Sequence, residues 1–276
     1  MTSITLPERN GTLSVYRLSD PPEFATLDPN EAAAAPRVFY SAAHVVAQPL
    51  TDNDPWLDGA IDWDATLKFR DYLYGLGLGV AEAMDTAQRG MGLDWPGALE
   101  LSRRSLSNAS DVGQNALIAC GAGTDHLSPA DVSAIDDIIA AYEMQCAAIE
   151  DAGGRVILMA SRALAAAAVG PQDYARVYDR ILSQLRQPAI LHWLGEMFDP
   201  ALRGYWGEQD DDAAMEVAVD IIARNQANVD GIKISLLSAE KEIAMRRQLP
   251  AGVRMYTGDD FNYPKLIAGD ERGFSH

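Results

Sequence analysis

Residues 155–195 read RVILMASRALAAAAVGPQDYARVYDRILSQLRQPAILHWLG, and this stretch decides the fold class. The apolar runs at 155–163 and 188–195 have the composition of buried strands. Between them, residues 171–185 carry apolar side chains at the three- and four-residue spacing of a helix, and Gly170 before Pro171 marks its start. A strand, a helix and a second strand in this order predict a parallel βαβ unit.

The same alternation continues through the rest of the chain. Helices are predicted at residues 62–76, 96–106 and 128–153, and we expect Asp62 and Ser128 to begin two of them. Alternating strands and helices in a chain of 276 residues predict one (β/α)₈ TIM barrel of the α/β class. The five further strands are predicted at residues 37–45, 79–87, 115–123, 229–235 and 253–259.

Both ends of the chain depart from the barrel pattern. Residues 1–36 are predicted to form an N-terminal extension with a β-ribbon, because two short alternating runs flank Asn10 and Gly11. The barrel domain is then expected to span residues 37–276. Because GFSH (273–276) stands where an eighth strand would begin, we expect the barrel to be truncated at its C-terminus.

Composition restricts the class of partner. The chain has 22 basic and 40 acidic residues and a formal charge of −18, which disfavours binding to nucleic acid or to anionic membranes. No uncharged apolar run is long enough for a membrane span, and the N-terminus lacks a signal-peptide pattern, so we expect a cytoplasmic protein. Cys120 and Cys146 have no C-x-x-C spacing and are predicted to be buried thiols.

The segment VDGIKIS (229–235) places Lys233 inside an apolar strand. Its neighbours Ile232 and Ile234 must point to the opposite face of the sheet. Desolvation lowers the pKa of a lysine amine, so that the neutral form can attack a carbonyl and form an imine. The alternative is a structural ion pair with a carboxylate such as Glu82 or Asp259.

Other polar side chains follow the predicted strands, at the ends where barrel enzymes carry their reacting groups. Hydroxyl, amide, carboxylate and imidazole groups together suit a neutral polyhydroxylated substrate such as a sugar. For each carboxylate, a solvated loop position or a helix N-cap is the alternative. The expected substrate-binding residues are Asp85, Thr86, Gln88, Ser235, Gly258 and Asp259, and additional pocket residues are His44, Glu82, Asp125, His126 and Asp260.

The order of these fragments resembles the dihydrodipicolinate synthase and N-acetylneuraminate lyase superfamily of class I aldolases, in a dihydrodipicolinate synthase-like branch. The resemblance implies a Schiff-base-forming lyase or aldolase that needs no cofactor, with Lys233 as the imine-forming nucleophile. It also implies a small-molecule carbonyl substrate and assembly into homodimers or homotetramers. The resemblance runs from about Arg37 to His276 and rests on residues 61–84, 188–195, 229–235 and 256–276.

Two departures from the family pattern bear on the substrate. His192 stands where the family has a proton-relaying tyrosine, and a histidine can also relay protons. MDTAQRG (84–90) replaces a glycine- and threonine-rich motif that holds a keto-acid carboxylate, and Asp85 would repel such a group. We therefore expect a keto-sugar or a sugar-derived carbonyl compound, with cleavage, condensation or dehydration as the reaction.

Two other functions are compatible with the same residues. His44, Glu82, Asp85 and His192 offer nitrogen and oxygen ligands from several strands, which would suit a divalent metal in a sugar isomerase, an epimerase or a class II aldolase. No compact metal-binding motif accompanies them. The second alternative is an inactive barrel that binds carbohydrate.

Overall fold

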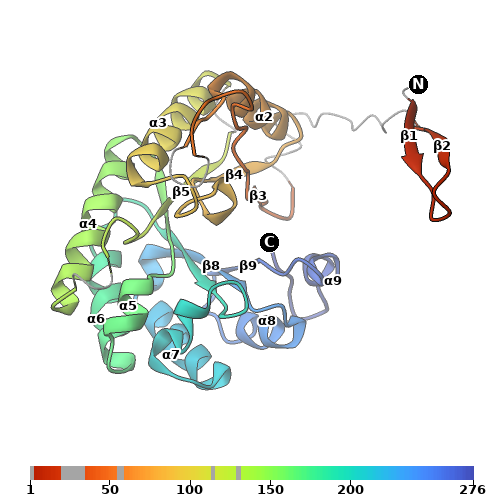
Figure 1. Cartoon of the computed structure of the whole chain (residues 1–276). Helices are drawn as coiled ribbons and strands as arrows, with labels where there is room; N and C mark the ends of the chain where they lie inside the picture. Colours follow the sequence, from red (N-terminus) through yellow and green to blue (C-terminus); the bar gives the residue numbers. More distant parts are fainter. Residues whose placement is uncertain (1–2, 20–34, 55–58, 113–115, 129–131) are drawn as a thin grey trace.

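A curled parallel sheet forms the body of the protein, in a computed structural model that describes residues 3–19, 35–54, 59–112, 116–128 and 132–276 (Figure 1). The seven strands are hydrogen-bonded in chain order, as consecutive βαβ units predict. The prediction of a parallel α/β sheet is therefore confirmed. The strands are β3 (Tyr40–Ser41), β4 (Gly79–Glu82), β5 (Ile118–Ala122), β6 (Arg155–Leu158), β7 (Ala189–Leu194), β8 (Val229–Ser235) and β9 (Arg254–Thr257).

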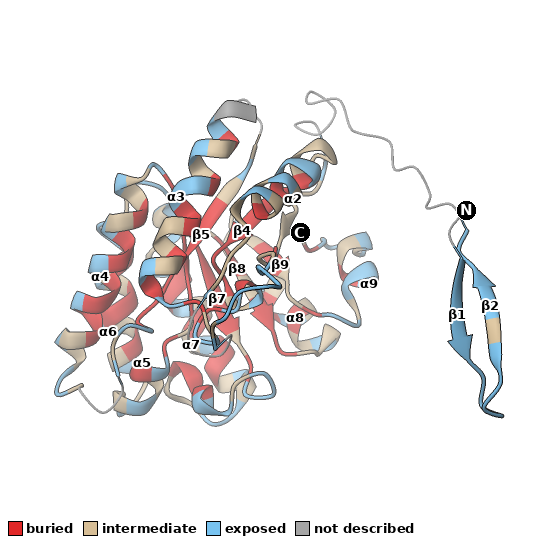
Figure 2. Ribbon diagram, turned by 45° about the horizontal axis from the view of Figure 1, so that its top comes forward, coloured by how far each residue is buried: buried red, intermediate tan, exposed pale blue. Residues whose placement is uncertain are grey.

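Helices cover the outer face of this sheet (Figure 2), and buried residues of the helices and strands pack in one hydrophobic cluster. Asp62 caps the first of them by accepting a hydrogen bond from the amide of Ala65, as predicted. The helices are α2 (Trp63–Gly75), α3 (Trp95–Val112), α4 (Ile135–Asp151), α5 (Arg162–Ala167), α6 (Pro171–Leu182), α7 (Asp211–Arg224), α8 (Ala239–Arg246) and α9 (Tyr263–Ala268).

One predicted helix start is wrong. Helix α4 begins at Ile135 and not after Ser128. The carboxylate of Asp137 accepts hydrogen bonds from the amides of Ser133 and Ala134, both at 2.9 Å. These bonds satisfy amides that precede the first turn and so favour a helix that begins at Ile135. Residues 129–131, which follow Ser128, lie outside the described residues.

The first strands of the chain form a separate two-stranded sheet. β1 (Ser3–Pro7) pairs with β2 (Leu13–Arg17) in antiparallel register, and Gly11 adopts a φ of +83° in the turn between them. Such a φ favours glycine, because a side chain would be strained there. Most residues of both strands are exposed (Figure 2).

The last residues of the chain lie beside β9. The amide of His276 donates to the carbonyl of Met255 at 2.8 Å, and its carbonyl accepts from the amide of Thr257 at 2.9 Å. On the other side, the imidazole Nδ1 of His276 accepts a hydrogen bond from the amide of Val38 at 2.9 Å. His276 thus connects β9 with the segment that leads into β3.

Alternation along the strands divides the core into two layers. On β8, Ile232 and Ile234 belong to the layer between the sheet and the helices. Trp193 on β7 packs in the same layer, with its ring centroid 6.1 Å from that of Trp206, as expected for a side chain facing away from the barrel interior. The inner layer is smaller and contains Ala81, Met84, Ala119, Ile157, Met159, Ile190 and Tyr256.

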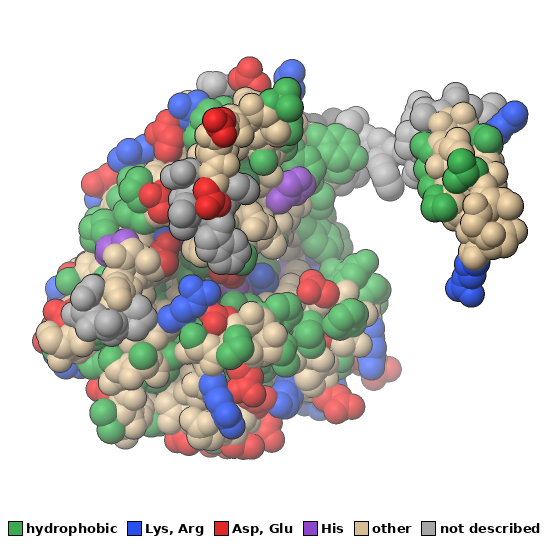
Figure 3. All heavy atoms as spheres, viewed as in Figure 1, with side chains coloured by type: hydrophobic (Ala, Val, Ile, Leu, Met, Phe, Trp, Pro, Cys, Tyr) green, Lys and Arg blue, Asp and Glu red, His purple; other side chains and the backbone are tan. Residues whose placement is uncertain are grey.

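Cysteine and surface chemistry agree with the composition. Cys120 and Cys146 are buried free thiols, as predicted. Within the described ranges, none of the helices has the length and apolarity that a membrane span requires. On the face shown in Figure 3, basic side chains are interspersed with acidic ones and form no continuous basic patch.

A buried ion pair joins α2 to β4. Two nitrogens of the Arg70 guanidinium donate to the two carboxylate oxygens of Glu82, at 2.8 and 2.9 Å, and both side chains are fully buried. Because Ala81 faces the barrel interior, Glu82 faces the helices. Glu82 therefore lies outside the expected pocket, where it holds Arg70.

We expect Glu82→Gln to lower the free energy of unfolding by about 3–5 kcal/mol, because it leaves the buried Arg70 guanidinium without its counter-charge. Urea unfolding followed by circular dichroism measures this change. Glu100→Gln is the control: it removes the exposed Arg104–Glu100 pair on α3 and should cost less than about 0.5 kcal/mol. Equal effects of the two substitutions would contradict the prediction.

Candidate active site

A cavity of about 420 Å³ opens at the carboxyl ends of the strands and contains the side chain of Lys233. We call it the lysine cavity. Side chains from β7 and β8 and from the turns after β4 and β9 line it, because the carboxyl ends of parallel strands meet at one edge. Its polar lining includes Asp85, Thr86, His192, Ser235, Thr257, Asp259 and Asp260, together with Gly258.

Lys233 is held in a desolvated position without a fixed partner. Burial lowers the pKa of its amine, and the charges of Asp85 and Asp260 oppose that shift without cancelling it. Among the residues that the structure describes, no side chain forms an ion pair or a hydrogen bond with the Lys233 amine. The structural ion pair considered as an alternative is thus not observed, and the amine is available to a ligand.

Gly258 leaves the space that Lys233 occupies. A Cβ atom at this position would lie 2.8 Å from Cε of Lys233 and 2.7 Å from the carbonyl oxygen of Ile234. Both contacts are shorter than van der Waals packing allows. The glycine therefore has a steric role beside the lysine side chain, and its amide donates to the Ile234 carbonyl at 2.8 Å.

His192 lies next to Lys233, because the two residues are register partners in the β7–β8 pair. The imidazole is 2% exposed, and neither ring nitrogen has a hydrogen-bond partner among the described residues. Burial lowers the pKa of the imidazole well below its usual value, and the charge of Lys233 lowers it further. The ring is therefore neutral at pH 7, and both of its nitrogens are available for a hydrogen bond with a ligand.

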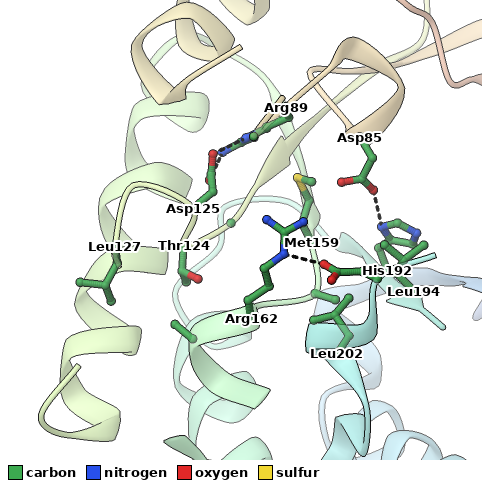
Figure 4. Close-up of a pocket in the computed structure, with 15 residues that line it drawn as sticks. Asp85, Arg89, Thr124, Asp125, Leu127, Met159, Arg162, His192, Leu194 and Leu202 are labelled. Carbon is green, nitrogen blue, oxygen red and sulfur yellow. Dashed lines mark hydrogen bonds and ion pairs between the residues drawn. The ribbon is translucent and has the colours of Figure 1, made fainter. Parts of the chain in front are cut away.

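Asp85 faces both of these groups. Its carboxylate Oδ2 lies 4.0 Å from Nδ1 of His192 (Figure 4). Burial raises the pKa of the carboxyl, whereas the charges of Lys233 and Arg162 lower it to a smaller extent. Asp85 lies in a 3-10 turn (Asp85–Ala87) that follows β4. Ala83, just before this turn, has a positive φ of 54°. Strand β4 therefore ends at Glu82, earlier than the predicted end at residue 87.

A second cavity of about 120 Å³ adjoins the first. We call it the arginine cavity, because Arg89 and Arg162 line it, and it shares Asp85, His192 and Leu194 with the lysine cavity (Figure 4). Arg89 was missed in the sequence, although it belongs to the MDTAQRG segment. Nothing local distinguishes an arginine that points inward from one that points to solvent.

Some of the expected pocket residues line one of the two cavities, and the others line neither. Asp85, Thr86, Ser235, Gly258, Asp259 and Asp260 line the lysine cavity, and Asp125 lines the arginine cavity. The carboxylate of Asp259 accepts hydrogen bonds from the amides of Phe261 and Asn262, both at 2.8 Å, in the turn before α9, whose N-cap residue is Asn262 and not Asp259. The residues that line neither cavity are His44, Glu82, Gln88 and His126.

Each residue outside the cavities has another environment. Gln88 is exposed, and its backbone has a left-handed conformation with a φ of 65°. Its carbonyl accepts a hydrogen bond from the amide of Met91. The ring of His44 packs against Phe69, with centroids 4.9 Å apart. Nδ1 of His126 lies 2.7 Å from the amide nitrogen of the Gln145 side chain.

The four residues considered for a metal site do not come together. Glu82 faces Arg70 outside the barrel interior, and His44 packs against Phe69. Only Asp85 and His192 approach each other. Across the described part of the chain, three or more His, Cys, Asp or Glu side chains nowhere form a group that could hold a metal ion.

The chain belongs to the family described as "Protein of unknown function (DUF993)", which matches residues 4–276. No curated protein matches the chain. Among solved structures, it is similar to a dihydrodipicolinate synthase from Bacillus anthracis, with 16% identity and a TM-score of 0.60 over 87% of this chain and 70% of the other.

Two further structures share the fold. A prophage protein of the dihydrodipicolinic acid synthase family from E. coli K12, in complex with pyruvate, is 13% identical with a TM-score of 0.61 over 87% of this chain and 69% of the other. A 2-keto 3-deoxygluconate aldolase from Picrophilus torridus is 16% identical with a TM-score of 0.52 over 85% and 73%. At these identities the similarity shows the TIM-barrel-like fold.

The buried neutral His192 makes stability depend on pH. Its pKa is lowered in the folded state, so the unfolded state binds more protons below pH 6.5 and stability is lost as the pH falls. Between pH 6.5 and 5, we expect the free energy of unfolding of the parent to fall with each pH unit. This fall should exceed that of His192→Gln by up to about 1.4 kcal/mol per pH unit. Urea unfolding at several pH values tests this, and parallel curves for the two proteins would contradict it.

Proposed function

We propose that this protein is a Schiff-base-forming lyase of the class I aldolase type, acting on a keto-sugar or a sugar-derived carbonyl compound. One observation carries the proposal: the Lys233 amine lies in an accessible cavity, with a lowered pKa and without a bound carboxylate among the described residues. A lowered pKa increases the fraction of neutral amine at pH 7, and the neutral amine is the nucleophile.

The proposed reaction begins at the substrate carbonyl. The Lys233 amine adds to the carbonyl carbon, and loss of water leaves a protonated imine. For carbon–carbon cleavage, a base removes the proton from the hydroxyl two carbons away. The electron pair of the broken carbon–carbon bond then forms the enamine double bond while the imine π pair moves to nitrogen, so that an aldehyde leaves and an enamine remains. Protonation of the enamine and hydrolysis of the imine release the second product and restore the amine.

His192 and Asp85 are placed to move the protons in these steps. His192 is neutral and its ring nitrogens have no partner among the described residues, so the ring can hydrogen-bond a bound hydroxyl and pass its proton on without keeping it. Asp85 has a raised pKa and lies near both His192 and Lys233, so its carboxyl holds a proton more readily than a free aspartic acid and is placed to exchange one with them. We assign His192 as the proton relay and Asp85 as a substrate ligand that also exchanges protons.

The lining of the lysine cavity favours a hydroxylated substrate over a simple keto acid. Asp85 and Asp260 place negative charge near the amine, which disfavours a carboxylate beside it. Thr86, Ser235 and Thr257 offer hydroxyl groups in the same cavity. Hydroxyl and carboxylate groups together can donate to and accept from the hydroxyls of a sugar.

The comparisons support this proposal at the level of fold. One structural neighbour contains pyruvate and another is a keto-deoxygluconate aldolase, so barrels of this shape bind and cleave small carbonyl compounds. Lys233 lies on the sixth strand of the parallel sheet, which is the position that the resemblance to class I aldolases assigns to the imine-forming lysine.

Borohydride reduction tests the proposal directly. With dihydroxyacetone and with five- and six-carbon keto-sugars, we expect a covalent adduct on Lys233, located by peptide mass spectrometry, and no adduct in Lys233→Met. His192→Gln should slow turnover by about 10²–10⁴-fold, because it removes a proton-transfer group.

Lys241→Met is the matched control, because Lys241 pairs with Asp211 on the protein surface. Its adduct and activity should equal those of the parent. An adduct distributed over the surface lysines, or none with any of these compounds, would reject the Schiff-base mechanism. Saturable sugar binding without adduct or turnover would favour a carbohydrate-binding barrel.

A further inference from the structure

The arginine cavity is not used by the chemistry assigned to Lys233. It lies between the turns that follow β4, β5, β6 and β7, and Asp85 and His192 form the wall between it and the lysine cavity. Figure 4 shows Asp85 and His192 on one side of it and Asp125 and Thr124 on the other. A ligand atom near this wall is therefore within reach of both cavities.

The charges in the arginine cavity are paired. Two nitrogens of Arg89 donate to the carboxylate of Asp125, at 2.7 and 3.0 Å. Nε of Arg162 donates to the carboxylate of Asp199 at 2.5 Å. Asp85 is the third acidic residue in the lining of this cavity, and burial raises the pKa of its carboxyl. An anionic group would meet no unpaired cation here among the described residues, so the charge balance favours a neutral ligand.

Both polar and apolar groups line this cavity. Arg89 is almost fully buried, and its position is set by further bonds to the carbonyl of Gly121 and the side chain of Gln145, both at 2.5 Å. In contrast, the Arg162 side chain is 55% exposed and has donors left for a ligand. The apolar walls come from Leu127, Met159, Leu194 and Leu202. Polar groups beside apolar walls suit the hydroxyls and the carbon chain of a polyol.

We propose that the arginine cavity binds the neutral, hydroxylated tail of the substrate, and that Arg162 determines specificity for this tail. This inference rests on the proposed function, because Lys233 would hold the carbonyl end. A volume of about 120 Å³ corresponds to about four water-sized groups at ~30 Å³ each, and so accommodates a short hydroxylated tail.

This arrangement places the bond to be broken at the wall between the cavities. The carbonyl fragment would stay on Lys233 in the lysine cavity, and the tail would leave as the aldehyde from the arginine cavity. Asp85 and His192 line both cavities, so they would contact both fragments. Substrates without a tail would still form an imine but would leave the arginine cavity empty.

Binding of simple polyols tests the tail site independently of Lys233. Erythritol and threitol are titrated into the full chain by calorimetry, and into Arg162→Gln, Ala160→Phe and Lys233→Met. Ala160 lines the cavity and is only partly buried, so a phenylalanine there has room to project into it. We expect at least one polyol to bind the parent and Lys233→Met with affinities within about twofold of each other.

Arg162→Gln and Ala160→Phe should each weaken that binding by about tenfold or more, because the first removes charged donors and the second fills the cavity. Arg180→Gln is the matched control, since Arg180 on α6 is a similarly exposed arginine, paired with Glu143 on α4. It should change nothing. Absence of polyol binding by the parent, or binding that neither substitution weakens, overturns the inference.

Reductive trapping separates this inference from the proposed function. Dihydroxyacetone, which has no tail, should label Lys233 equally in the parent, Arg162→Gln and Ala160→Phe. The second probe is the six-carbon keto-sugar that labels the parent best. Its labelling of Lys233 should fall about tenfold in both variants. Equal labelling of the variants by both compounds overturns the tail site and leaves the Schiff-base lysine. Polyol binding with the expected variant effects, but without any adduct, supports the tail site and rejects the Schiff base.

Discussion

The parallel hydrogen-bonded register of β7 and β8 is the constraint on which the site depends. It pairs Ala189 to Leu194 with Val229 to Ser235 and so places His192 directly beside Lys233. Both strands direct their neighbouring side chains, such as Trp193 and Ile234, into the layer beneath the helices. A slip of one residue would exchange the two faces and move the amine and the imidazole out of the barrel interior.

Electrostatic balance then sets the protonation state of this pair. Burial lowers the pKa of both groups, and the charge of Lys233 further lowers the pKa of His192. Asp85 and Asp260 oppose the shift of Lys233 without forming an ion pair with it. Other buried charges are neutralised by direct contact, as in the Arg70–Glu82 and Arg89–Asp125 pairs. Lys233 has no such contact among the described residues, and a buried ionisable group of this kind is typical of functional sites.

The fold was largely predictable because it follows from local patterns. The apolar runs and helical spacing between residues 155 and 195 required a βαβ unit, and repetition of that unit required a parallel sheet. The position of Lys233 could be predicted in the same way, because alternation within VDGIKIS leaves only one face for it. The boundaries were less predictable: α4 begins at Ile135 because Asp137 binds the amides before it.

The sequence by itself determined the order of strands, the class of fold and the presence of a lysine on the inner face of the sixth strand, since these depend on periodicity along the chain. Only the tertiary structure decided which polar residues share a cavity. Glu82 is drawn outward by Arg70, Gln88 turns to solvent, and Arg89 and Asp199 enter the site from separate turns. Contacts between residues far apart in the chain depend on how the turns after each strand fold, and no local pattern encodes that geometry.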